Sequence, residues 1–252
     1  GRRPLLVTDG VVGRLPVLAE PEGQLAAAGL AVARFDGVPG EPTTAEVAAG
    51  LAALRAHGGD SVLAVGGGSV IDTAKAIAVM ATHDGDIAAY MGSDRFSRPR
   101  LPLLAAATTA GTGAEVTRFT IITDPASDVK MLISDPRLVP DVAIADPLLT
   151  YGCPRPVTAA TGLDALTHAV EAYVSRRATP TSDLFALPAA GEIGRHLERA
   201  WRDGDDVEAR RAVMLGALHA GIAFSNASVA LVHGMSRPIG AYFHVPHGIA
   251  NA

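Results

Sequence analysis

The sequence predicts an α/β domain built on a parallel sheet, followed by an all-α domain. In the first 150 residues, short apolar runs alternate with segments of helical periodicity, a pattern typical of a parallel sheet covered by helices on both faces. After the Asp-Pro pair at residues 146–147 the apolar runs disappear, and from Pro156 onward only helical periods remain, separated by Pro, Gly and Asp-Gly. We therefore expect two domains, residues 1–150 and residues 151–252, with a boundary near residues 150–154.

Each element of the first domain follows from a local pattern. Apolar runs predict the strands, and Thr43 or Thr44 is expected to cap the second helix at its N-terminus. Two further runs, residues 119–123 and 130–134, predict a small pair of antiparallel strands in addition to the parallel sheet. The expected parallel strands are residues 4–8, 31–35, 61–65, 101–106 and 142–145, and the expected helices are residues 11–28, about 44–57 and 70–82.

Composition excludes several classes of protein. The 252-residue chain is 48% hydrophobic, which is enough for a sizeable core. Its net charge of −5, without any basic run, argues against a nucleic-acid binder. Residues 212–232 are apolar but are broken by four polar side chains, so we expect a buried helix and no membrane span. Cys153 is the only cysteine, which excludes an internal disulfide and predicts a cytoplasmic location, and residues 1–3 do not resemble a signal peptide.

Two loops that follow expected strands have the composition of phosphate-binding loops. Residues 66–69 (Gly-Gly-Gly-Ser) join a strand directly to a helix; glycines let a phosphate approach the backbone, and the helix N-terminus supplies N–H groups. This loop is neither a G-x-G-x-x-G fingerprint nor a Walker A loop, so a tight strand-to-helix turn remains the alternative. Residues 108–113 are rich in Thr and Gly and lie at the same edge of the expected sheet. Two such loops favour a ligand as long as a dinucleotide.

Asp9 ends the first expected strand, at the edge where the two loops gather. Its carboxylate can accept hydrogen bonds from a ribose diol and would repel a 2′-phosphate, which favours NAD over NADP. A turn residue before Gly10 is the alternative reading. Lys75 and Lys130 are the only lysines of the chain, and their scarcity raises the question of a function for each.

A possible set of metal ligands lies in the second domain. Residues 160–173 are expected to form a helix, and Asp164 and His168, four residues apart, would share one face of it. Residues 231–248 add His233 and His247, with Gly and Pro between them that let the chain fold back. One carboxylate and three imidazoles suit a divalent first-row metal. The alternative is two unrelated helical pieces whose histidines are buried or capping.

Taken together, these segments resemble the iron-containing, or group III, alcohol dehydrogenases, on the dehydroquinate synthase-like fold. The resemblance extends over essentially the whole chain in the family's order. The matching segments are residues 66–76 (GGGSVIDTAKA), 108–117 (TTAGTGAEVT), 162–173 (GLDALTHAVEAY) and 224–252 (FSNASVALVHGMSRPIGAYFHVPHGIANA).

The resemblance implies a metal-dependent oxidoreductase that transfers a hydride between NAD(H) and a small alcohol or aldehyde, with the active site in a cleft between the two domains. NADP and Zn²⁺ are the alternatives to NAD and Fe²⁺. The oligomeric state is left open, a homo-oligomer among the alternatives. The implied metal ligands are Asp164, His168, His233 and His247. The implied cofactor contacts are Asp9, Gly66, Gly67, Gly68, Ser69, Asp72, Thr108, Thr109, Thr112, Thr117 and Lys130, whereas Lys75 is given a structural role.

The chain departs from the family pattern in four places. Glu41 stands where the family often has Asn, and Ala114 replaces a common Ser. Arg237 stands near the place of a second His with a proposed role in proton transfer, so His244 becomes the candidate for that catalytic role. Full-length members extend further at both ends, so we expect this chain to be a fragment or a partial gene product.

Two other functions stay open on the sequence alone. One is a zinc-dependent relative on the same fold, of the glycerol dehydrogenase or dehydroquinate synthase type. The other is a truncated, non-catalytic chain that binds nucleotide or metal, or acts only as a subunit of an assembly.

Overall fold

The computed structural model describes residues 1–243, 245 and 247–251, and it divides into two compact units. Unit 1 consists of Gly1–Ala107 and Arg118–Ile144, and unit 2 consists of Thr108–Thr117 and Ala145–Ala252. The division near residue 145 lies close to the expected boundary, but the Thr/Gly-rich segment Thr108–Thr117 belongs to unit 2 and not to unit 1.

Unit 1 is built on a five-stranded parallel sheet with the order β2-β1-β3-β5-β8, and the predicted fold class is confirmed. This order reverses direction between β1 and β3, which in such sheets is the place where ligands bind beyond the carboxyl ends of the strands. The strands of this sheet are β1 (Pro4–Asp9), β2 (Ala33–Val38), β3 (Ser61–Gly66), β5 (Leu103–Ala107) and β8 (Val142–Ile144).

A second, three-stranded sheet also belongs to unit 1. Its strands β6 and β7 pair antiparallel, as predicted for residues 119–134, and β4 adds a short parallel pairing to β7. The strands are β4 (Gly92–Ser93), β6 (Phe119–Asp124) and β7 (Val129–Ser134).

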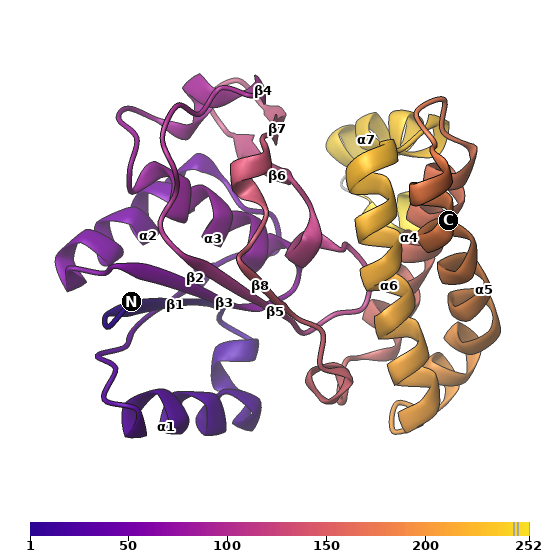
Figure 1. The fold of residues 1–252 in the computed structure, drawn as a ribbon, viewed down its shortest axis with the longest axis horizontal. Helices are drawn as coiled ribbons and strands as arrows, with labels where there is room; N and C mark the ends of the chain where they lie inside the picture. The colour runs from indigo at the N-terminus through magenta and orange to yellow at the C-terminus, as the bar shows by residue number, and fades with distance from the viewer. Residues whose placement is uncertain (244, 246, 252) are drawn as a thin grey trace. The chain divides into compact units, whose positions relative to one another are not determined.

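The helices of unit 1 are α1 (Ala19–Ala27), α2 (Thr44–His57) and α3 (Gly68–Met80). Figure 1 shows α2 and α3 over one face of the large sheet and α1 on the opposite side. Thr43 caps α2 with a complete capping box, and Gly58 ends this helix in the left-handed conformation, φ 64°. The helix expected over residues 11–28 is wrong in its first half, because Pro16 and the neighbouring turns give only short 3₁₀ segments before α1 begins.

Helix α3 is the centre of the core of unit 1. Ten of its thirteen residues are buried, including the fully buried Lys75, and it packs on β1, β3 and β5. The Lys75 ammonium donates a hydrogen bond to the carbonyl oxygen of Phe119 (2.7 Å) and lies 3.9 Å from the Asp72 carboxylate. Asp72 in turn accepts from the backbone N–H of Ile121 (3.0 Å) and its carbonyl accepts from the Thr120 hydroxyl. Lys75 and Asp72 therefore join α3 to β6.

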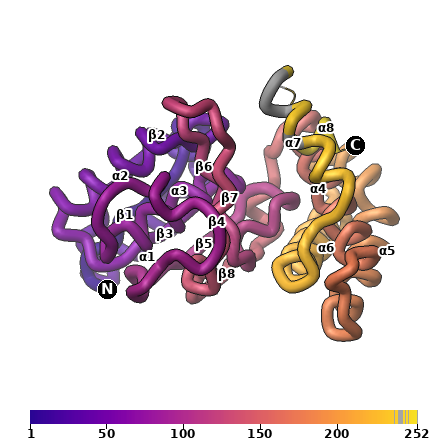
Figure 2. Tube along the Cα trace, turned by 90° about the horizontal axis from the view of Figure 1, so that it is seen from above, coloured from indigo at the N-terminus to yellow at the C-terminus, as the bar shows by residue number. Residues whose placement is uncertain are grey.

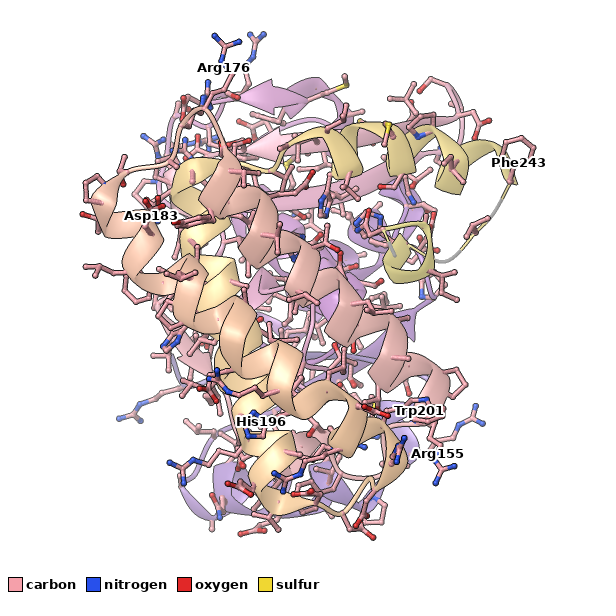
Figure 3. The ribbon with its side chains drawn as sticks, turned by 90° about the vertical axis from the view of Figure 1, so that its right-hand side faces the viewer. Arg155, Arg176, Asp183, His196, Trp201 and Phe243 are labelled. Carbon is pink, nitrogen blue, oxygen red and sulfur yellow. The ribbon has the colours of Figure 1, made fainter. Side chains whose placement is uncertain are left out.

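Unit 2 is helical wherever the structure describes regular elements after residue 150. Its helices are α4 (Arg155–Val174), α5 (Pro180–Arg202), α6 (Val207–Ala227), α7 (Leu231–Phe243) and α8 (His247–Ala250). The three long helices pack through small residues, among them Ala165 with Ala217 and Ala169 with Ala220, so their axes can approach closely. Figure 3 shows α4 and α5 side by side, with Arg155 and Trp201 at the same end of the pair.

Helices α7 and α8 complete unit 2 by returning to α4. Both contact α4, and they contact each other; Figure 2 shows the three together. This return brings the C-terminal motif of the chain beside the middle of α4. No helix among the described residues combines the length and the apolar character that a membrane span requires.

The two lysines differ in burial, and this difference predicts different effects on stability. Replacing Lys75 by Met leaves Asp72 without its buried partner, and we expect the free energy of unfolding to fall by about 3–5 kcal/mol. Replacing Lys130 by Met breaks a partly exposed pair with Glu41, and we expect a loss below about 1 kcal/mol. Urea denaturation of both variants measures the difference; equal losses would contradict the role given to Lys75.

Candidate metal centre and cofactor loops

Helix α4 presents two of the predicted ligands on its buried face. Asp164 and His168 are separated by one helical turn, and both side chains are almost fully buried. The Nε2 atom of His168 lies 3.8 Å from Oδ1 of Asp164. The His168 ring is stacked on Phe224 of α6, with ring centroids 4.1 Å apart, so neighbouring aromatic packing holds its plane.

Helices α7 and α8 bring the other two histidines to the same carboxylate. Nε2 of His233 lies 3.5 Å from Asp164 Oδ1, and Nε2 of His247 lies 3.7 Å from the same oxygen. One ligand atom from each of Asp164, His233 and His247 lies within 4.8 Å of the others. The His168 ring lies parallel to the His233 ring, with centroids 4.6 Å apart. Asp164, His233 and His247, which come from distant parts of the sequence, thus converge at one place, with His168 beside them.

The spacing of these atoms fits a shared cation better than direct hydrogen bonds. Hydrogen bonds between an imidazole and a carboxylate are about 2.7–2.9 Å long. Two donors about 2.1 Å from a tetrahedral ion lie about 3.4 Å apart, close to the 3.5–3.8 Å that separates Asp164 Oδ1 from the three Nε2 atoms. Asp164, His233 and His247 therefore fit a divalent metal ion, and His168 lies near the same oxygen although it has no ligand atom within 4.8 Å of all three.

Asn251 contacts three of the four predicted ligands, and the sequence analysis assigned it no role. Its amide nitrogen donates to Asp164 Oδ1 (2.7 Å) and lies 3.2 Å from Nε2 of both His233 and His247. The side-chain amide of Asn251 is a hydrogen-bond donor, so it suits a place beside a carboxylate oxygen and two imidazole nitrogens. Its position one turn after His247, in the same C-terminal motif, is the sequence signal that could have identified it.

Burial and mutual charge shift the ionisation of this cluster toward the state that metal ligands need. Burial alone would raise the pKa of Asp164, but the imidazoles around it hold this pKa below its usual value. Burial, reinforced by His233 and His247, lowers the pKa of His168 to about 4, although Asp164 opposes the shift. Near neutral pH, Asp164 is therefore a carboxylate and His168 a neutral imidazole, the forms that bind metals.

The close approach of α8 to the backbone of α4 determines the position of His247. A Cβ atom at Gly248 would overlap the carbonyl oxygen of Ala160 on α4, so only glycine lets α8 pack at this distance. The amide N–H of Asn251 bonds back to the carbonyl of His247 (3.1 Å) and continues this last turn.

In unit 1, the glycine loop begins α3 as predicted. Gly66 ends β3, Gly67 is the N-cap without a side-chain cap, and Gly68 is the first helical residue. The Ser69 hydroxyl donates to the carbonyl oxygen of Gly40, so in this structure it fastens a neighbouring loop and does not cap α3.

Three other predicted cofactor residues of unit 1 have structural partners. Asp9 accepts from the N–H groups of Val11 and Val12 (2.8 Å each) and so stabilises the turn after β1. Asp72 bonds to β6, as described above. Lys130 forms an ion pair of 2.6 Å with Glu41, the residue that stands where the family often has Asn.

Asp36 is an acidic residue that the sequence analysis missed. It lies in β2 near the carboxyl end of this strand, beside β1, and its side chain is exposed. An acidic residue after the second strand commonly binds a ribose diol in sheets of this kind. A search for a carboxylate at the end of the second expected strand could have found it.

The predicted threonine contacts lie in unit 2. Thr108 and Thr117 are buried, whereas Thr109 and Thr112 are partly exposed. The Thr112 hydroxyl accepts from the N–H of Ala114 at 3.3 Å. Gly113 has φ +62°, and a Cβ there would press against Gly221, so this loop is held tightly against α6. The predicted catalytic residue His244 lies outside the described residues.

The family of the chain follows from two sequence profiles. The profile described as iron-containing alcohol dehydrogenase matches residues 1–147, and the C-terminal profile of the Fe-containing alcohol dehydrogenase family matches residues 158–252. The chain belongs to the iron-containing alcohol dehydrogenase family, and the resemblance inferred from its motifs is confirmed.

Individual relatives match the chain over its full length. Alcohol dehydrogenase 4 of Schizosaccharomyces pombe is 42% identical over 251 residues, which are 100% of this chain and 60% of the relative. The NAD-dependent methanol dehydrogenase of Bacillus methanolicus is 40% identical over 251 residues, 100% of this chain and 66% of that enzyme. A crystal structure of 1,3-propanediol oxidoreductase superposes with a TM-score of 0.98 at 43% identity, covering 100% of this chain and 66% of that one. The chain thus spans 60–66% of the length of these relatives.

The contact between α8 and α4 predicts that Gly248→Ala weakens metal binding. The added methyl group must push α8 away from Ala160 and carry His247 with it, so we expect the metal dissociation constant to rise roughly tenfold or more. Isothermal titration with Zn²⁺ measures this. The control is Gly194→Ala in α5, where an added methyl group meets nothing within 4 Å, and binding should stay unchanged.

Proposed function

We propose that the protein is a metal-dependent alcohol dehydrogenase and aldehyde reductase that transfers a hydride between NAD(H) and a small alcohol or carbonyl compound. The observation that carries the proposal is the buried Asp164 carboxylate with three imidazoles 3.5–3.8 Å from one of its oxygens. Membership of the iron-containing alcohol dehydrogenase family supports the same reaction.

Asp164, His168, His233 and His247 would hold the ion in unit 2. A bound divalent ion supplies Lewis-acid polarisation of the substrate oxygen. The chain's own part is to keep Asp164 ionised, through the imidazoles around it, and His168 neutral, through burial. The Phe224 stack and the Gly248 contact hold these side chains in fixed orientations. We propose Fe²⁺ as the resident ion on the strength of the family; imidazole and carboxylate also accept Zn²⁺.

Unit 1 would bind the pyrophosphate of the dinucleotide. The sheet order reverses between β1 and β3, and the uncapped start of α3 follows β3 directly, so a pyrophosphate is accommodated at this helix N-terminus. The remaining predicted contacts, from Asp9, Asp72, Lys130 and the threonines of residues 108–117, stay part of the proposal. The relative from Bacillus methanolicus is named NAD-dependent, which favours NAD for this chain. We also propose a cytoplasmic location, because Cys153 is the only cysteine.

The first test removes a ligand. We expect His233→Ala or His247→Ala to abolish metal-dependent turnover while NADH affinity stays within a few-fold, because the nucleotide contacts lie elsewhere. NADH consumption with a panel of short aldehydes, measured with Fe²⁺, Zn²⁺ and a chelator, gives turnover, and fluorescence titration gives NADH affinity. The control is His196→Ala on α5, a histidine outside the cluster (Figure 3). Full turnover by metal-free protein would refute the mechanism.

The second test concerns cofactor choice. We expect a higher kcat/KM with NAD than with NADP, because acidic side chains at the ends of β1 and β2 repel a 2′-phosphate. We expect Asp36→Ala to lower the ratio of kcat/KM for NAD to kcat/KM for NADP more than Asp9→Ala does. The reason is that the Asp9 carboxylate also stabilises its own turn. Asp84→Ala, a distant and exposed acidic residue of unit 1, is the control. Comparable kcat/KM values for NAD and NADP in the wild type would remove this argument.

A further inference from the structure

Glu171 is a buried carboxylate on α4 to which the motif analysis and the proposed ligand set give no role. It lies two turns after Asp164 on the same buried face of the helix. Its Oε2 atom lies 2.6 Å from Nδ1 of His233, and both side chains are about 4% exposed or less. A buried carboxylate at this distance from an imidazole nitrogen is a strong, charge-assisted hydrogen bond.

The same carboxylate binds the beginning of α7. Its Oε1 atom accepts from the backbone N–H of Val232 (2.5 Å) and, at 3.4 Å, from that of His233. These N–H groups lie in the first turn of α7, where no intrahelical acceptor is present. Glu171 therefore holds both the backbone and the ring of His233.

The contact determines which nitrogen of His233 faces the proposed metal. A carboxylate only accepts hydrogen bonds, so Nδ1 must carry the proton, and in the neutral ring Nε2 then offers its lone pair. Nε2 is the atom that lies 3.5 Å from Asp164 Oδ1 and 3.2 Å from the amide nitrogen of Asn251. The opposite tautomer would place a proton on Nε2, where a metal needs the lone pair.

We propose that Glu171 is a positioning residue of the metal centre, which fixes the Nδ1–H tautomer and the ring orientation of His233 so that Nε2 is directed at the ion. The proposal rests on the proposed function, since it assumes His233 as a ligand. Partners of this kind on ligating histidines typically change metal affinity by 10–100-fold when they are removed.

The alternative is a purely structural role, in which Glu171 only caps α7. The two roles differ in what they change. Loss of a cap lowers stability, whereas loss of the Nδ1 acceptor changes the tautomer of one ring and the affinity for metal per folded molecule.

The experiment compares Glu171→Ala and Glu171→Gln in the full 252-residue chain. Two-bond ¹H–¹⁵N correlation spectra of metal-free protein report the His233 tautomer, and Co²⁺ titration in competition with a chelator gives the dissociation constant. For Glu171→Ala we expect the Nε2–H tautomer to become populated and Co²⁺ to bind 10–100-fold more weakly. Glu171→Gln keeps an acceptor oxygen for Nδ1, so it should retain most of the Nδ1–H tautomer and bind Co²⁺ with intermediate affinity.

Thr158→Val is the matched control. Thr158 is buried on the same helix and accepts from the guanidinium of Arg210 (2.9 Å), so its loss removes a buried hydrogen bond away from the four proposed ligands. This variant should melt at a lower temperature with its tautomer spectrum and Co²⁺ affinity unchanged.

The outcomes separate the two proposals. If Glu171→Ala only lowers the melting temperature, with the His233 tautomer and Co²⁺ affinity of the wild type, the positioning role is wrong. If wild-type protein binds neither Co²⁺ nor Fe²⁺, the proposed function fails, and the tautomer of the metal-free variants still decides whether Glu171 orients His233.

Discussion

The burial of one carboxylate is the constraint on which the organisation of unit 2 depends. Asp164 is almost fully enclosed, and an ionised carboxylate in such a place is strongly destabilising unless cations or donors surround it. The side-chain amide of Asn251 donates a hydrogen bond to Asp164, and the three histidine rings around the same oxygen come from three different helices, α4, α7 and α8. The chain must therefore return twice to the middle of α4. Helices α7 and α8 make this return, and their contacts with α4 are what make the cluster a single site.

Close packing of small residues makes the return possible. Alanines fill the seams between α4, α5 and α6, and glycines allow three approaches that a side chain would block: Gly248 on Ala160, Gly113 on Gly221 and Gly216 on Ile193. A packed interior transmits small displacements, so backbone contacts remote from the ligand atoms still control where those atoms lie. The precision of the candidate metal centre is thus a property of the helix packing as much as of the four ligands.

Charges in unit 1 show how one residue type takes different roles according to burial. Lys75 is enclosed beside Asp72 and joins α3 to β6, whereas Lys130 pairs with Glu41 at a partly exposed site. The buried Lys75 stabilises the fold, because a buried ammonium group must keep its partners. The pair of Lys130 with Glu41 leaves a cation at the surface, where exchange of partners has a low energetic cost. Of the two lysines, only the partly exposed Lys130 is therefore suited to meet a soluble ligand.

The sequence alone determined the class of fold, the glycine loop before α3, a threonine N-cap for α2 at residue 43 or 44, and the pairing of Asp164 with His168, because each depends on residues close together in the chain. Strand alternation and helical spacing are local, and so is a turn of helix. It left open whether Asp9 would serve its own turn, and it could not determine that Asn251 and Glu171 would meet the histidines. Those contacts join residues separated by as many as 87 positions. They depend on how closely helices pack, which the tertiary structure alone decides.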